Sequence, residues 1–355
     1  MNKFKFLCLL LLGLIIFSCG SNSDKKTSYF KLKTDENKTE FQLGETIQGS
    51  IENLKDRQID SIRLFFQQKY LKTLTAETSF SVSLEKTKLG RQKLEAIVFS
   101  EGETDTISDE LKIYNNKAPK AYTYKVIKEY PHDSEAYTQG LEFYQDTLYE
   151  STGQYGNSSL RKLDLETGEV LNKINLEDTY FGEGLTILNN KLYLLTWREK
   201  EGLIYNLDTF EQTGTFGYNQ SKEGWGLCND GEKLYKSDGT EKIWILDAET
   251  LAEKDFIQVA TNTKIYSKFN ELEWVEGKIY ANTYQFPSVT IINPENGAIE
   301  GVIDFRGLRE QLSNLPSLDL QNHVLNGIAY NKNTQKLYVT GKNWDTIFEV
   351  EIIEK

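Results

Sequence analysis

The sequence after Ala121 contains the same pattern five times, and this repeat constrains the fold more than any other feature. Each copy begins with a small or polar residue followed by an apolar one: Gly140-Leu141, Gly184-Leu185, Gly226-Leu227, Glu271-Leu272 and Gly327-Ile328. An apolar residue followed by tyrosine comes next: Leu148-Tyr149, Leu192-Tyr193, Leu234-Tyr235, Ile279-Tyr280 and Leu337-Tyr338. The second pair begins eight residues after the first in four copies and ten residues after it in the last. One supersecondary unit therefore recurs.

Each copy holds enough β-rich segments for a small antiparallel sheet. A third run follows the tyrosine, at residues 160–165, 203–207, 243–246, 289–292 and 347–352. In four copies it ends near a turn that begins with Asp or Asn, and a fourth run follows, as at 169–176 and 298–305. Repeat starts lie 44, 42, 45 and 56 residues apart. Four strands in about 45 residues are typical of a propeller blade, so an all-β, five-bladed β-propeller is predicted at 121–355.

The ends of the repeat region predict that the ring closes. The fifth copy reaches Lys355 after its third run, so it lacks an outer strand. Residues 122–130 (YTYKVIKEY) form a β pattern upstream of the first copy and would supply that strand, which removes an exposed sheet edge. The long fourth interval contains a Leu-rich insertion at 307–321, which we expect to form a helical or irregular flap over one face.

The first 19 residues have the pattern of an export signal. Lys3 and Lys5 precede an apolar run at 6–17 that is too short to span a bilayer, and Cys19 ends the segment. This arrangement resembles a bacterial lipobox, so we expect Cys19 to be lipidated and residues 20–27 to form a polar tether. The mature chain would then sit in the bacterial cell envelope, at the periplasmic face or the cell surface, anchored to the membrane by its lipid. An ordinary secretory signal with an incidental Cys19 is the alternative.

Residues 28–115 lack the repeat and are predicted to form a separate small immunoglobulin-like β-sandwich. The prediction rests on short alternating runs at 29–32, 61–67, 80–84, 94–99 and 110–114. Nothing in this segment indicates chemistry, so we expect it to act as a spacer or docking module. Residues 115–121, which include Pro119, are the expected linker to the propeller.

Charge, histidine and cysteine content narrow the classes of function. The formal net charge of −12 argues against nucleic-acid binding, because no basic stripe is present to neutralise phosphates. Two histidines, His132 and His323, have no spacing suited to zinc, and we expect His323 to cap the flap. We expect no required cofactor and no catalytic metal, while acidic side chains leave a structural cation in the channel open. Cys228 is the cysteine left after the signal, so no intramolecular disulfide is expected. A monomer is expected.

Unusual polar and aromatic residues occupy equivalent places in different blades. Those at or just before the innermost strands are Gln139, Glu183, Trp225, Asn270 and Glu271, and those at the second strands are Trp197, Asp238, Tyr284 and Lys342. Because innermost strands line the central channel, these side chains should converge at one mouth. Aromatics, carboxylates, amides and a lysine at one end of a tunnel form an active-site composition. Packing between blades is the alternative for each tryptophan.

Seven segments resemble, in order and spacing, the plant and bacterial glutamine cyclotransferases. They are Tyr137-Thr138-Gln139-Gly140-Leu141, Phe181-Gly182-Glu183-Gly184-Leu185, Leu195-Thr196-Trp197, Gly224-Trp225-Gly226-Leu227, Ser237-Asp238-Gly239, Asn270-Glu271-Leu272-Glu273 and Val339-Thr340-Gly341-Lys342-Asn343-Trp344. The resemblance covers residues 121–355. It implies a five-bladed propeller enzyme that converts the N-terminal glutamine of a peptide or protein into pyroglutamate and releases ammonia.

The resemblance also implies a role for individual residues. It makes Glu183 the general acid and base, with a pKa raised by burial, and its neighbouring glycines would let the substrate approach closely. Lys342 would neutralise the oxyanion or, alternatively, pair with a carboxylate such as Glu271 or Asp238.

The same matching assigns the substrate-binding residues. Gln139 and Asn270 would hydrogen-bond the substrate, and Trp197 and Trp225 would wall the pocket. Tyr284 stands where the family usually has tryptophan, a change that we expect to alter substrate preference.

Two other readings stay open at this stage. A non-catalytic propeller could bind peptides or an envelope partner and use the sandwich as a second contact surface. A glycosidase would need at least two channel carboxylates, and Glu183, Asp238, Glu271 and Glu273 are the candidates.

Overall fold

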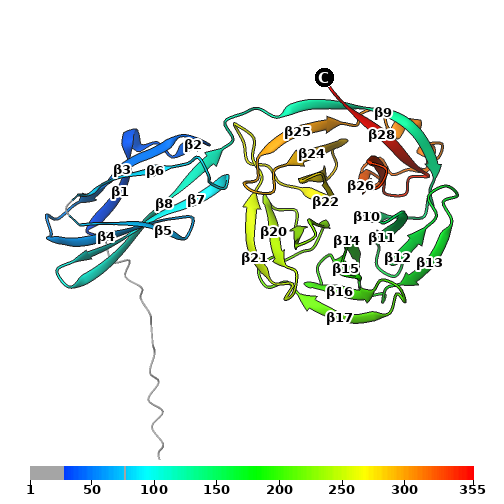
Figure 1. Cartoon of the computed structure of the whole chain (residues 1–355), viewed down its shortest axis with the longest axis horizontal. Coiled ribbons are helices and arrows are strands. Elements are labelled where there is room, and N and C mark those ends of the chain that lie inside the picture. Colours follow the sequence, from blue (N-terminus) through cyan, green and yellow to red (C-terminus); the bar gives the residue numbers. More distant parts are fainter. Residues whose placement is uncertain (1–27, 76) are drawn as a thin grey trace, which may run out of the picture.

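The computed structural model describes residues 28–75 and 77–355, which fold almost entirely into β-sheets (Figure 1). The sheets of the N-terminal part lie beside a ring formed by the rest of the chain (Figure 1). The predicted signal at 1–19, the lipidated Cys19 and the tether at 20–27 lie outside the described residues. No helix within the described ranges has the length and apolar character needed to cross a membrane.

Two sheets enclose one hydrophobic core in the N-terminal part. The first has the order β1 (Phe30–Thr34), β3 (Thr46–Asn53), β6 (Ser79–Ser83). The second has the order β2 (Glu40–Gln42), β8 (Glu103–Tyr114), β7 (Gly90–Ser100), β4 (Ile59–Phe66), β5 (Lys69–Leu74), and a short turn, η1 (Asp35–Asn37), follows β1. Ile47 and Ile51 of the first sheet and Leu94 and Val98 of the second belong to the shared core. The sequence runs coincide with β1, β4, β6, β7 and β8 but missed the other strands. The immunoglobulin-like assignment stays a prediction.

The ring consists of four-stranded antiparallel blades, and this confirms the predicted propeller-like, all-β architecture (Figure 1). Blade one is β10 (Thr138–Tyr144), β11 (Thr147–Thr152), β12 (Ser159–Leu163), β13 (Val170–Asn175). Blade two is β14 (Gly182–Leu188), β15 (Lys191–Thr196), β16 (Glu201–Asn206), β17 (Gln212–Gly217). Blade three is β18 (Leu227–Asn229), β19 (Lys233–Ser237), β20 (Lys242–Asp247), β21 (Glu253–Gln258). Blade four is β22 (Phe269–Val275), β23 (Lys278–Thr283), β24 (Ser288–Ile292), β25 (Ile299–Asp304).

Blade five joins the two ends of the ring. Its strands are β26 (Leu325–Asn331), β27 (Lys336–Gly341), β28 (Thr346–Glu354), β9 (Lys120–Pro131). As predicted, β9 is the outer strand and pairs antiparallel with β28, from Thr346 opposite Pro131 to Glu354 opposite Tyr122. The same strand also pairs parallel with β25, so it bridges blades four and five along the rim (Figure 1). Because β9 begins at Lys120, the last two residues of the expected linker belong to the ring.

The glycine that opens most repeats lets the innermost strands of neighbouring blades approach closely. A Cβ atom on Gly140 would lie 2.6 Å from the Leu185 backbone nitrogen, and one on Gly184 would lie 2.7 Å from the Trp225 carbonyl oxygen. A Cβ atom on Gly226 would overlap the Asn270 carbonyl oxygen. The expectation that Gly184 makes room for substrate is therefore wrong, because the space beside it holds the backbone of blade three.

The insertion before blade five forms a flap with two short 3₁₀ turns, η2 (Arg309–Gln311) and η3 (Leu315–Ser317). Leu308 and Leu312 bury their side chains in the core of blades four and five and anchor the flap. His323 caps it, because its Nδ1 accepts a hydrogen bond of 3.2 Å from the Asp319 backbone nitrogen. The His323 ring also meets the Tyr137 ring edge-on at 6.2 Å.

The N-terminal sheets pack directly against blades three and four. The Gln258 side chain accepts a hydrogen bond of 2.6 Å from the Arg91 backbone nitrogen, and Lys88 forms an ion pair of 2.5 Å with Asp255. Gly90, at φ +88°, leaves room for the Gln258 side chain at this contact. Ala260 and Ala298 of the ring contribute to the core of the sheets. The two parts are thus in contact through buried as well as polar groups.

Candidate active site

A cavity of about 200 Å³ lies at the end of the ring where innermost strands begin and second strands end. All seven residues predicted to catalyse or bind substrate line it. The complete lining is Tyr137, Gln139, Gln154, Phe181, Glu183, Trp197, Trp225, Asn270, Tyr284 and Lys342. Antiparallel pairing explains the convergence, because the start of a first strand and the end of its hairpin partner share one edge.

Sequence reasoning missed Tyr137, Gln154 and Phe181 as lining residues. Tyr137 and Phe181 open two of the motifs that carry the family resemblance, so the motifs themselves pointed to them. Gln154 follows β11 at nearly the same place that Trp197 and Tyr284 have after β15 and β23. The equivalence of positions between blades was the available signal for Gln154.

Glu183 belongs to β14 and presents a buried carboxyl group to the cavity. It is 4% exposed, and within the described part of the chain its Oε2 atom has no hydrogen-bond partner. Burial raises the pKa of Glu183 well above its usual value; Lys342 opposes this rise through its positive charge, and Glu223 and Glu199 add to it. A carboxyl group with a raised pKa and a free oxygen is able both to accept and to return a proton.

Lys342 follows β27 and brings a positive charge to the same cavity. Its Nζ atom lies 4.8 Å from the Tyr137 ring centroid and 5.4 Å from that of Tyr284, so it packs against two π faces. Burial lowers the pKa of Lys342 to about 8, and the charge of Glu183 opposes the decrease. A lysine with this pKa is mostly protonated near neutral pH and is the cation among the described residues that line the cavity.

Glu271 and Asp238 do not reach the cavity, contrary to the expectation that they would converge with the other residues. The Glu271 carboxylate accepts a hydrogen bond of 3.0 Å from the Ile328 backbone nitrogen of blade five. Asp238 accepts from the Trp244 indole at 2.7 Å and from Thr240. Both carboxylates therefore have other hydrogen-bond partners. The alternative in which Lys342 pairs with Glu271 or Asp238 does not hold.

A single carboxyl group, that of Glu183, is present among the described residues that line the cavity. Hydrolysis of a glycosidic bond by the usual two-carboxylate mechanism needs a second acid across the substrate. The geometry therefore does not support the glycosidase alternative.

Gln139 has a defined amide orientation. The Asn326 side chain donates to its Oε1 atom at 3.1 Å and to the Thr138 carbonyl oxygen at 2.9 Å. Gln139 therefore offers its Nε2–H groups as donors. The second amide, Asn270, is held through its backbone, since the Ser237 hydroxyl donates to its carbonyl oxygen at 2.7 Å.

Aromatic rings in mutual contact form the wall of the cavity. Phe181 contacts Trp197 at 5.4 Å between ring centroids and Tyr137 at 6.2 Å. On the other side, Trp225 meets Tyr284 edge-on at 5.8 Å. Trp197 and Trp225, the two predicted walls, thus belong to two separate groups of packed rings, and Tyr284 packs in the group of Trp225 as an aromatic residue.

Histidine and cysteine are structural here. His132 is buried and its ring nitrogens hydrogen-bond Glu150 at 3.0 Å and the Trp344 carbonyl oxygen at 2.8 Å. Cys228 is a buried free thiol whose pKa burial raises well above its usual value. In the described ranges no three His, Cys, Asp or Glu side chains are grouped so that they could hold a metal ion.

Comparison with known proteins agrees with this arrangement. Residues 93–352 match the glutamine cyclotransferase family. The chain belongs to this family. It is 39% identical, over 229 residues, to a glutaminyl-peptide cyclotransferase of Arabidopsis thaliana, a match that covers 64% of this chain and 71% of the relative. The crystal structure of Myxococcus xanthus glutaminyl cyclase superimposes with a TM-score of 0.62 at 34% identity and covers 67% of this chain and 99% of that one. These matches confirm the resemblance to glutamine cyclotransferases that the seven sequence motifs indicated.

Proposed function

We propose that this chain is a glutaminyl-peptide cyclotransferase, which converts the N-terminal glutamine of peptides or proteins into pyroglutamate and releases ammonia. One observation carries the proposal: a buried carboxyl group, Glu183, with a raised pKa and an unpartnered oxygen among the described residues, shares a small cavity with Lys342. Membership of the glutamine cyclotransferase family supports the same reaction.

The reaction requires a proton to move from one nitrogen of the substrate to another. Glu183 accepts a proton from the α-ammonium group, and the free amine attacks the side-chain amide carbon. A new C–N bond forms and the carbonyl oxygen becomes an oxyanion, which the Lys342 ammonium and the Gln139 Nε2–H stabilise. Glu183 then returns the proton to the amide nitrogen, the old C–N bond breaks, and ammonia leaves. The new ring nitrogen, which still carries two hydrogens, gives its second proton to the regenerated Glu183 carboxylate, which passes it to solvent. A raised carboxyl pKa suits this exchange, because α-amines have a pKa near 8.

The cavity suits one glutamine side chain. Its volume of about 200 Å³ is small, and packed rings surround it. Trp197, Trp225 and Tyr284 exclude water and confine the substrate near Glu183, while Gln139 and Asn270 hydrogen-bond its polar atoms. Confinement brings the amine within reach of the amide carbon, which is where a cyclisation gains most of its rate.

The proposal includes a location. Residues 1–19 resemble a lipoprotein signal, which supports attachment by lipid on Cys19 to the bacterial cell envelope. The enzyme is proposed to be a monomer. The N-terminal sheets are proposed as an immunoglobulin-like sandwich that separates the ring from the anchor. Their packing on blades three and four supports a fixed rather than a loose spacing. The proposed scheme needs no cofactor.

A coupled assay of ammonia release from a glutamine-initiated dipeptide tests the function. The purified wild-type protein should release ammonia at neutral to mildly basic pH, and none across that range would contradict the proposal. Glu183→Gln should lower kcat by roughly 10²–10⁴-fold, the usual effect of removing a general acid or base. Glu249→Gln, which changes an exposed glutamate of blade three, is the matched control and should keep full activity. Dipeptide binding without ammonia release would favour the non-catalytic alternative.

A further inference from the structure

Glu223 joins the two tryptophans of the aromatic wall by hydrogen bonds. Its Oε2 atom accepts a hydrogen bond of 2.9 Å from the Trp197 indole and another of 2.9 Å from the Trp225 indole. Trp197 packs in one group of rings with Phe181 and Tyr137, and Trp225 packs in another with Tyr284. One oxygen atom thus links the two halves of the wall.

We propose that Glu223 is a positioning residue that sets the separation of Trp197 and Trp225 and thereby the fit of the substrate side chain. This inference rests on the proposed function for the identity of the substrate. It does not make Glu223 catalytic, because its carboxylate is not among the groups that line the cavity.

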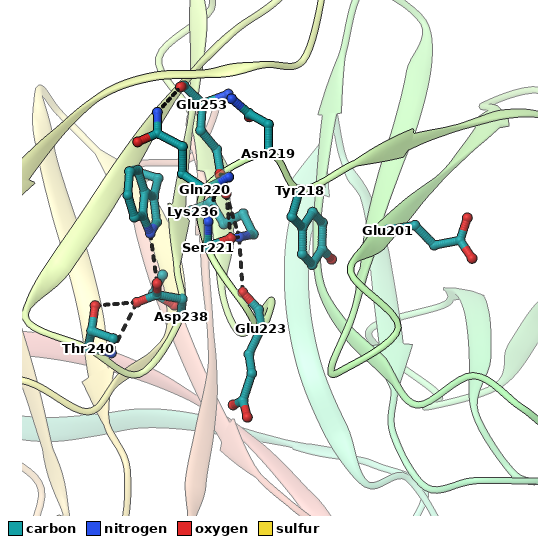
Figure 2. Close-up of polar contacts among 12 residues, drawn as sticks. Glu201, Tyr218, Asn219, Gln220, Ser221, Glu223, Lys236, Asp238, Thr240 and Glu253 are labelled. Atoms are coloured by element: carbon teal, nitrogen blue, oxygen red, sulfur yellow. Dashed lines mark hydrogen bonds and ion pairs between the residues drawn. The ribbon is translucent and has the colours of Figure 1, made fainter. Parts of the chain in front are cut away.

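The backbone of Glu223 is held by a buried ion pair behind it. Lys236, whose side chain is fully buried, donates 3.0 Å to the Glu223 carbonyl oxygen and 2.9 Å to Glu253. Glu253 also accepts from the Gln220 and Ser221 backbone nitrogens at 2.7 and 2.9 Å. Figure 2 shows Lys236 between Glu253 and the Glu223 backbone, with the Glu223 carboxylate pointing away from the lysine. The loop is thereby fixed with its carboxylate free to meet the indoles.

Glu223 has one further partner at the rim. Arg198 donates to its Oε1 atom at 3.3 Å, and the Arg198 guanidinium stacks 3.7 Å from the Trp197 ring. Arg198 is largely exposed, so its contribution is small. The two indole hydrogen bonds are partly shielded and involve a charged acceptor, and such bonds are about twice as strong as neutral ones.

Glu223→Gln tests the positioning role. A glutamine oxygen in the place of Oε2 would accept both indole hydrogen bonds without the charge that strengthens them, and an NH₂ group there would accept neither. Both bonds should therefore weaken or be lost. With a glutamine-initiated dipeptide, kcat/KM should fall roughly tenfold or more, chiefly through KM. Of the five indole N–H signals in an NMR spectrum, those of Trp197 and Trp225, assigned by Trp→Phe variants, should move.

Glu199→Gln is the matched control for charge. Glu199, like Glu223, raises the pKa of Glu183, but it accepts its hydrogen bonds from the Tyr155 hydroxyl and the Arg198 backbone nitrogen and not from an indole. Glu199→Gln should leave the Trp197 and Trp225 indole signals and KM near their wild-type values.

If Glu223→Gln leaves both indole signals and KM unchanged, the inference is overturned. If Glu223→Gln does not fold, Trp197→Phe should move the Trp225 indole signal, and an unmoved signal overturns the inference equally. The spectra need no substrate, so an inactive wild-type protein would contradict the proposed function alone.

Discussion

Glu183 and Lys342 face the same buried cavity from blades two and five, and each shifts the pKa of the other through its charge. Burial dominates both groups, and it disfavours the charged form of each. A substrate that places an ammonium group near Glu183 and an amide oxygen near Lys342 would lie between the two. The arrangement therefore links the pH dependence of the reaction to two residues on opposite sides of the ring.

Activity should decline at high pH as Lys342 loses its proton. Burial places the pKa of Lys342 at about 8, so the cation near the oxyanion is present below that pH and disappears above it. In Lys342→Arg the guanidinium stays charged, so the decrease of kcat on the alkaline side should shift to higher pH. The guanidinium fits the cavity less well than the lysine ammonium, so kcat itself should be lower. Rates of ammonia release between pH 6 and 10 at saturating dipeptide measure this limb. An alkaline limb that is identical in the two proteins would assign it to another group.

Gly226→Ala should destabilise the ring by about 3 kcal/mol, at the upper end of the usual cost of overpacking. The new Cβ atom would overlap the Asn270 carbonyl oxygen, which belongs to a buried backbone and has no room to move. Gly217→Ala is the control, because no atom lies within 4 Å of its Cβ position and the residue is at an exposed strand end. Urea unfolding of both variants and the wild type gives the two changes in free energy. Equal stabilities would show that the blades separate easily.

The repeat made most of the ring predictable, because its spacing locates equivalent positions in different blades. Gln139, Glu183 and Asn270 could be placed at one end of the channel for this reason. Glu271 occupies an equivalent position too, yet its side chain turns to a free backbone N–H of blade five. Sequence position alone does not reveal in which direction a side chain of this kind points.

Glu223 and the missed strands were hidden for other physical reasons. Glu223 lies in a loop, and of its two indole partners Trp197 is distant in the sequence while Trp225 is close to it. No regular spacing between the three residues therefore indicated the contact. In the N-terminal part, β3 contains Gly49 and several polar residues, and β5 is a lysine-bearing edge strand. Edge strands carry fewer buried apolar residues, and this weakens the alternation on which the prediction depended.

The stability of the ring should depend on pH through Glu142. Its carboxylate accepts hydrogen bonds from Thr186 and from the Ile187 backbone nitrogen at 2.6 and 3.1 Å, but burial outweighs these and raises its pKa from 4.5 to about 7. The folded state therefore binds a proton more tightly than the unfolded chain. This contribution to stability is complete below pH 4.5 and is lost as the pH rises through 7, a change of at most about 3 kcal/mol.

Glu142→Gln should remove this dependence, since an amide stays neutral at every pH and its oxygen still accepts from Ile187. The variant should equal or exceed the wild type in stability at pH 8, and the slope of its unfolding free energy between pH 5 and 8 should be smaller. Urea unfolding at several pH values measures both. Glu232→Gln, at an exposed turn of blade three, serves as the control and should retain the wild-type slope. The same slope in Glu142→Gln would mean that the carboxyl group is already ionised in the folded protein at pH 5.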